Sequence, residues 1–169
     1  MSRPTYNPDL LLPDDDGCYL ILDPDLRILG ASPEYLRATL LWHESIAGQH
    51  VFDVFPDNPA LPRADGVGNL QASLREAVRS GKPQAMPEQR YDVRDRISGE
   101  SWVEKYWLST NTPVTVQDSN EVSHVIHQVR DITSLVTLRQ WINERALIID
   151  EQHATLEQLL RDATAYRRS

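Results

Sequence analysis

The chain has 169 residues, a net charge of -8 and one cysteine, Cys18. A single cysteine excludes an intrachain disulfide and a multi-cysteine zinc site, and the acidic balance disfavours nucleic-acid binding, which needs clustered lysine and arginine. The sequence starts without a basic segment followed by an apolar run, and no apolar run approaches the roughly 20 residues of a spanning helix. We therefore expect a cytoplasmic protein with one core and no membrane insertion.

The first part of the chain predicts a lead-in, a hairpin and a short helix. Residues 1–16 contain three prolines and an acidic run and are expected to cap or pair with another part of the fold. Apolar residues predict strands over 19–22 and 27–30, joined by an Asp-Pro-Asp turn. Ser32 followed by Pro33 is typical of a helix start, with serine as the N-cap and proline in the first turn.

The middle of the chain predicts one longer helix and three more strands. Residues 50–68 hold too many Pro, Gly and Asp residues for a long helix and favour short turns. Apolar residues at helical spacing predict a helix over 69–80, ended by Gly81. Alternating patterns predict strands around 89–93, 102–112 and 122–130. This order indicates an α+β domain in which helices cover one face of a five-stranded antiparallel sheet.

A long helix with a heptad pattern occupies residues 134–169. Its two seam positions fall on Leu135, Leu138, Ile142, Arg145, Ile149, Gln152, Leu156 and Leu159, and continue to Ala163 and Tyr166. Apolar residues at these spacings predict a dimeric, left-handed coiled coil, in which the two polar positions fix the register or allow two registers. The alternative is a helix that folds back on its own domain through a second apolar face, made by Trp141, Leu147, Ile148 and Leu160.

Four segments together resemble a known family. They read YLILDPDLRILGASPEYL, GQHVFDVFPDNP, EKYWLSTNTPV and HVIHQVRDIT, and their order is similar to that of PAS domains, the sensory modules of bacterial histidine kinases and related regulators. The resemblance covers about residues 17–133. It implies a PAS fold, and it implies that Asp131, Ile132 and Thr133 couple the last strand to a signalling helix.

The resemblance also limits which cofactors this chain is expected to bind. The flavin-binding, light-sensing branch of the family requires a cysteine in a helix motif that is absent here. The haem-binding branch places its axial histidine on the helix that corresponds to residues 69–80, which contains none. We expect neither group, and the cofactor, if any, stays unknown. The chain has no kinase phosphoacceptor helix, ATP-binding glycine box or cyclase motif, so any catalysis is expected outside it.

The last two strands supply the candidate ligand site. Alternate residues of a strand face the same side of a sheet, so Val125, His127 and Val129 share one side of the last strand. This set is the more apolar of the two, and the resemblance implies that it faces inward. The resemblance adds Trp107, Ser109 and Asn111 from the preceding strand, with Tyr35 and Phe55 from the helical region. Polar side chains in an apolar interior are typical of a small-molecule pocket. Alternatively, His127 bonds a backbone carbonyl or Asn111 inside a filled core.

The remaining histidines, His43, His50, His124 and His153, show no metal-ligand spacing, and we expect them at surface or turn positions. No metal site is predicted. Trp42, Phe52 and Phe55 are expected to pack between the short helices and the sheet.

The function that this pattern favours is a sensor. It would detect a small molecule or another cytosolic cue and pass the signal through a homodimeric coiled coil to an output module such as a histidine kinase of a two-component system. The alternative is a ligand-free PAS scaffold for dimerisation or protein interaction. An enzyme built on this fold is the third possibility, although the sequence shows no acid, base or metal set for it.

Overall fold

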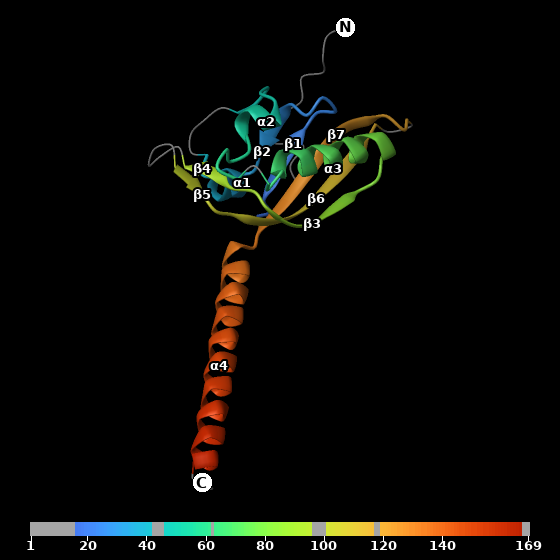
Figure 1. Cartoon of the computed structure of the whole chain (residues 1–169). Coiled ribbons are helices and arrows are strands. Elements are labelled where there is room, and N and C mark those ends of the chain that lie inside the picture. Colours follow the sequence, from blue (N-terminus) through green and yellow to red (C-terminus); the bar gives the residue numbers. More distant parts are fainter. Residues whose placement is uncertain (1–15, 42–45, 62, 96–100, 117–118, 167–169) are drawn as a thin grey trace. The chain divides into compact units, whose positions relative to one another are not determined.

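The computed structural model describes residues 16–41, 46–61, 63–95, 101–116 and 119–166, and of 164–166 only the backbone. Its chain divides into two compact units, Met1–Ile132 and Thr133–Ser169. The first unit contains a five-stranded antiparallel sheet in the order β2-β1-β7-β6-β3 (Figure 1). The strands are β1 Tyr19–Leu22, β2 Ile28–Ala31, β3 Gln84–Arg90, β6 Tyr106–Thr115 and β7 Val122–Asp131. The predicted α+β sheet is confirmed.

Alternation along the strands explains which face is buried. On β7 the side chains of Val125, His127 and Val129 point inward, whereas Gln128 and Arg130, on the other face, are exposed. On β7 this period of two is what a sheet with one covered face requires. All four residues of β1 are buried, and Leu20 and Leu22 are the two that belong to the core cluster.

Three helices supply the cover. They are α1 Pro33–Ala38, α2 Val51–Val54 and α3 Gly66–Ser80, and α3 runs across one face of the sheet (Figure 1). Ser32 caps α1 as predicted: its hydroxyl accepts from the amide of Tyr35 at 3.2 Å, and also from that of Tyr19 on β1 at 2.9 Å. Because the Ser32 hydroxyl accepts from both amides, it connects the start of α1 to strand β1 of the sheet. Gly81 ends α3 with a left-handed φ of 63°.

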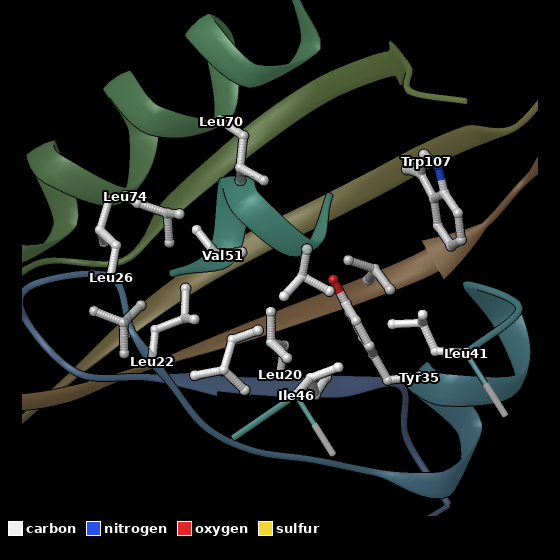
Figure 2. Close-up of a cluster of buried hydrophobic side chains, with 14 of the residues drawn as sticks. Leu20, Leu22, Leu26, Tyr35, Leu41, Ile46, Val51, Leu70, Leu74 and Trp107 are labelled. Carbon is white, nitrogen blue, oxygen red and sulfur yellow. The ribbon is translucent and has the colours of Figure 1, made fainter. Parts of the chain in front are cut away.

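The core is the layer between these helices and the inward sheet face. Its members include Leu20, Leu22, Leu26, Ile28, Tyr35, Leu41, Ile46, Val51, Leu70, Leu74, Trp107, Val125 and Val129 (Figure 2). Leu70 and Leu74 are four residues apart on α3, which places them on the same helix face. Phe52 and Phe55 pack against this core, as expected, whereas Trp42, His43 and the lead-in over 1–15 lie outside the described residues.

The strand predicted around 89–93 was misplaced. The edge strand β3 begins at Gln84 and ends at Arg90, and Pro87 lies inside it. An edge strand tolerates proline because one row of its N–H groups needs no ladder partner. The register of β3 against β6 shifts between Met86 and Gln89, on either side of that proline. Because residues 84–90 are largely polar and include a proline, their sequence did not predict a strand there.

Two further elements differ from the prediction. A two-stranded hairpin, β4 Val93–Asp95 with β5 Ser101–Val103, was missed because each strand has only three residues. The helix α3 begins at Gly66, three residues before the predicted start, since the carboxylate of Asp57 accepts from the amide of Val67 at 3.0 Å. A cap ten residues away in sequence is invisible to a local pattern.

The prediction for His124 was wrong. This residue was expected at the surface, but its side chain is only 6% exposed, and its Nδ1 lies 2.8 Å from the hydroxyl of Ser123. His50, in contrast, lies at the start of α2, where its Nδ1 accepts weakly from the amide of Phe52 at 3.4 Å. It is half-buried and is the N-cap of α2, and it also forms an isolated bridge with Arg27.

The second unit is the helix α4, Thr133–Tyr166, with 34 residues. Its large apolar side chains are exposed, among them Leu135, Leu138, Trp141, Ile142, Leu147, Ile148, Ile149, Leu156, Leu159 and Leu160. On a helix the guanidinium of Arg145 can reach a residue four positions earlier, and its Cζ lies 5.3 Å from the ring centroid of Trp141. The long helix is confirmed, and it presents an apolar surface suited to an interaction.

The packing of α3 on the sheet can be tested by truncation. Leu74→Ala removes a fully buried side chain, and we expect it to lower the free energy of unfolding by about 2–5 kcal/mol. Leu108→Ala is the matched control, because Leu108 is 39% exposed, and its cost should stay below about 1 kcal/mol. Urea unfolding of both variants measures the difference. Equal losses would contradict the proposed core.

Candidate functional site

A cavity of about 50 Å³ lies between the helices and the inward sheet face. Its lining residues are Tyr35, Thr39, Val51, Phe55, Leu70, Met86, Gln89, Tyr91, Val93, Trp107, Ser109, His127 and Val129. These residues are mostly apolar, and none of them carries a charge at neutral pH. A cavity of this size holds a few water molecules or one very small ligand.

The structure brings together six of the eight predicted pocket residues. They are Tyr35, Phe55, Trp107, Ser109, His127 and Val129. The other two, Asn111 and Val125, are fully buried but do not line the cavity. Met86, Gln89 and Tyr91 also line the cavity, and none of them was predicted as a pocket residue. Met86 lay outside the strand predicted around 89–93, and Gln89 and Tyr91 lay within it without being assigned to an inward face. Leu70 lay in the predicted helix over 69–80, and Val51 in a segment predicted as turns.

A chain of hydrogen bonds orients His127. Its Nδ1 lies 2.6 Å from Oδ1 of Asn111, and Nδ2 of Asn111 donates to the hydroxyl of Ser73 on α3 at 2.8 Å. Because an amide oxygen only accepts, Nδ1 of His127 carries the proton in this bond. In the neutral ring Nε2 is then an acceptor. Complete burial lowers the pKa of His127 from 6.5 to about 4, so the ring is neutral at physiological pH.

Aromatic side chains form the rest of the wall. The ring of Tyr35 meets His127 edge-on, with centroids 6.1 Å apart, and meets Phe55 edge-on at 5.8 Å. The indole N–H of Trp107 donates to the carbonyl of Tyr91 at 2.8 Å, and the Tyr91 hydroxyl donates to the carbonyl of Phe55 at 2.5 Å. These bonds connect β6, α2 and the segment after β3, and they hold the aromatic wall in one arrangement.

The predicted coupling residues adjoin this wall. Asp131 is paired directly with Trp107 across the β6–β7 ladder. Lys105 contacts both, because its Nζ lies 2.5 Å from Oδ2 of Asp131 and 5.9 Å from the centroid of the Trp107 ring. The amide of Ile132 donates to the carbonyl of Tyr106 at 2.9 Å. The end of β7 is thus attached to the strand that carries the cavity wall.

The one cysteine of the chain, Cys18, is not among the residues that line the cavity. Cys18 is half-buried, and burial, with the charges of Glu34 and Asp131, raises the pKa of its thiol to about 11, which leaves little thiolate. No cluster of three or more His, Cys, Asp or Glu side chains suited to a metal ion occurs among the described residues. Within the same ranges, no helix has the length and hydropathy that crossing a bilayer requires.

A family model described as PAS fold matches residues 13–137. The chain belongs to the PAS family. The matched region contains the five-stranded sheet, the helices around the cavity and the Asp131-Ile132-Thr133 junction. Comparison with curated proteins gives no significant match.

Solved PAS structures are similar to this chain in fold. A PAS domain from Colwellia psychrerythraea is 15% identical, with a TM-score of 0.53 and coverage of 69% of this chain and 86% of that one. A LOV protein from Rhodobacter sphaeroides is 12% identical, with a TM-score of 0.55 and coverage of 73% and 64%. PAS-B of Drosophila melanogaster Cycle, solved with bound ethylene glycol, is 10% identical, with a TM-score of 0.51 and coverage of 68% and 98%. At these identities the likeness shows the PAS fold alone.

The buried imidazole predicts a pH dependence of stability. The unfolded chain protonates His127 near pH 6.5, whereas the folded chain does so only near pH 4. Protonation of His127 therefore does not lower the free energy of unfolding above about pH 6.5, and it lowers this free energy progressively as the pH falls from about 6.5 toward about 4. The loss is on the order of 3 kcal/mol.

His127→Gln removes this titration and keeps an amide that can donate to Asn111. We expect the free energy of unfolding of this variant to fall less than that of the wild type between about pH 7 and about pH 4.5 in urea titrations. His153→Gln, at an exposed position of α4, should keep the wild-type dependence. Since burial also lowers the pKa of His124, the difference between wild type and variant isolates His127. Parallel curves for wild type and H127Q would contradict the assignment.

Proposed function

We propose that residues 17–133 of this PAS protein are a sensor domain that binds a small molecule in the cavity. The main support is the cavity itself, in which the oriented His127 belongs to a mostly apolar and uncharged lining. An apolar pocket with a few placed polar groups is the usual form of a small-molecule site. We further propose that this chain has no catalytic activity and binds no nucleic acid, and that it acts in the cytoplasm.

The path of the signal is proposed to run along β6 and β7. A ligand that contacts Trp107 would change the position of its ring, which is within reach of the Lys105 ammonium. Lys105 would transmit that change to Asp131 through their ion pair, and Ile132 and Thr133 would carry it to the start of α4. Coupling of this kind requires an element with two arrangements that both sites bias.

The proposed output of the domain is a dimeric coiled coil formed by residues 134–169. The seam of Leu135, Leu138, Ile142, Ile149, Leu156 and Leu159 is exposed along α4, and a second copy of the same helix matches its heptad period. Arg145 and Gln152 interrupt the seam and supply the two-register element. In this proposal a partner kinase of a two-component system, or another output module, reads the register of the coil.

A ligand-free scaffold is the second candidate. The small size of the cavity favours it, because known ligand pockets of drug-sized molecules measure about 300–1,000 Å³. In that case His127 and Asn111 would serve the core alone, and α4 would set the geometry of a partner.

The coiled coil predicts a position-specific effect of charge. Ile149→Lys places an ammonium on the seam, and we expect it to weaken the dimer by at least about 100-fold. Leu147→Lys puts the same charge on an exposed leucine outside the seam and should change the dimer dissociation constant by less than about threefold. Analytical ultracentrifugation measures both. If L147K were the disruptive variant, the helix would use its second apolar face instead.

The coupling residues predict loss of communication without loss of fold. The test uses this chain joined through α4 to a histidine-kinase core, with autophosphorylation as the readout. Trp107→Phe, which alters the cavity wall, should change kinase output. In the background of Asp131→Ala or Lys105→Ala this change should fall at least about fivefold, although removing such a partly exposed ion pair costs only about 1 kcal/mol.

The matched control is Arg37→Ala, which breaks the exposed ion pair with Glu34 on α1. In this background W107F should act as in the wild type. An effect of W107F that is undiminished in D131A would show that the ion pair carries no signal.

A further inference from the structure

Two polar atoms of residues that line the cavity form no hydrogen bond among the described residues. Tyr35 is 5% exposed, and its hydroxyl forms no hydrogen bond within the described part of the chain. His127 is 3% exposed and bonds only through Nδ1 to Asn111, which leaves Nε2 as an open acceptor. Figure 2 shows Tyr35 with its hydroxyl oxygen directed into the buried cluster. Because both residues line the cavity, a molecule inside it can supply the hydrogen bonds that the protein does not.

These two atoms have complementary chemistry. Nε2 of His127 accepts, because the proton of the neutral ring lies on Nδ1, and the Tyr35 hydroxyl can donate. The rings lie edge to face with centroids 6.1 Å apart, so one small group can approach both. Ser109 also lines the cavity, and a serine hydroxyl can act as a hydrogen-bond donor or acceptor. A group that both donates and accepts matches this pair.

The wall also determines the charge of the occupant. No lining residue is cationic or anionic at neutral pH, since burial raises the pKa of Tyr35 and Tyr91 above their usual range and lowers that of His127. An ion would lose its hydration without gaining a counter-charge, which is costly. A neutral ligand meets no such penalty.

We infer that the cavity takes a compact neutral molecule with a hydroxyl group on an apolar body, whose O–H donates to Nε2 of His127 and whose oxygen accepts from the Tyr35 hydroxyl. This assignment rests on the proposed sensor function and specifies its ligand class. The volume of about 50 Å³ limits the apolar body to a few carbon atoms.

The test uses three probes of nearly equal size on the full chain. The probe 2-propanol has the hydroxyl donor, acetone has the same carbon skeleton without a donor, and acetate has the shape of acetone with a charge. Titrations are followed by the ¹⁵N resonances of the His127 imidazole. We expect a saturable shift of Nε2 with 2-propanol, at least about tenfold weaker binding of acetone, and no saturation with acetate.

Tyr35→Phe removes one oxygen and keeps the ring, and it should weaken 2-propanol binding about tenfold. Tyr19→Phe is the matched control, because Tyr19 is a buried tyrosine on β1 outside the cavity lining, and its effect should stay within about twofold.

Two outcomes would overturn the inference. If acetone or acetate bound as well as 2-propanol, the ligand class would be wrong, although a ligand cavity would stand. If no probe saturated while the chain stayed dimeric, the two polar atoms would hold water only. The dimerisation and coupling experiments above do not depend on either result, so a failure here is distinguishable from a failure of the sensor proposal.

Discussion

The antiparallel pairing of the ten-residue strands β6 and β7 positions both the polar group of the cavity and the junction with α4. The register of this ladder places Asn111 opposite His127 and Trp107 opposite Asp131. One pair orients the polar group of the cavity, and the other joins the cavity wall to the end of the domain. If β7 slipped by one residue against β6, His127 would turn to the other face of the sheet, away from Trp107. The cavity and its proposed connection to α4 therefore depend on the same backbone hydrogen bonds.

The buried polar groups show how the domain accommodates a histidine in its core. Asn111 is fully buried, and its amide bonds both His127 and Ser73, so that strand β6, strand β7 and helix α3 share one network. Each of these bonds contributes only about 1 kcal/mol, but an unsatisfied member would cost more than that. The network is thus a constraint on the tautomer of His127. It leaves Nε2 as the acceptor nitrogen of a residue that lines the cavity.

How far the sequence predicts this structure depends on the range of the interactions involved. The alternation on β7, the Ser32 cap and the glycine stop at Gly81 are local, and each was predicted correctly. The strand β3 was misplaced because Pro87 is tolerated only at a sheet edge, and a single sequence does not reveal which strand lies at the edge.

In the candidate site, too, local features were predicted from the sequence and long-range contacts were not. Trp107, Ser109 and His127 followed from strand alternation and family resemblance, and the structure places all three on the cavity. The contacts that give them chemical meaning link residues far apart in sequence, such as Trp107 with the carbonyl of Tyr91 and Lys105 with Asp131. Pairings of this kind depend on how the chain folds in three dimensions. The seam of α4 was readable from its period, but the partner that covers it still has to be measured.

Native mass spectrometry of the full chain purified from cells tests the central claim most directly, when it is compared with the same sample under denaturing conditions. The account predicts a dimer that carries a reproducible small neutral mass, which is absent from the denatured chain. A monomer would contradict the proposed coiled coil. A dimer without any bound mass would contradict the proposal that the cavity is the sensing element and would favour a PAS scaffold.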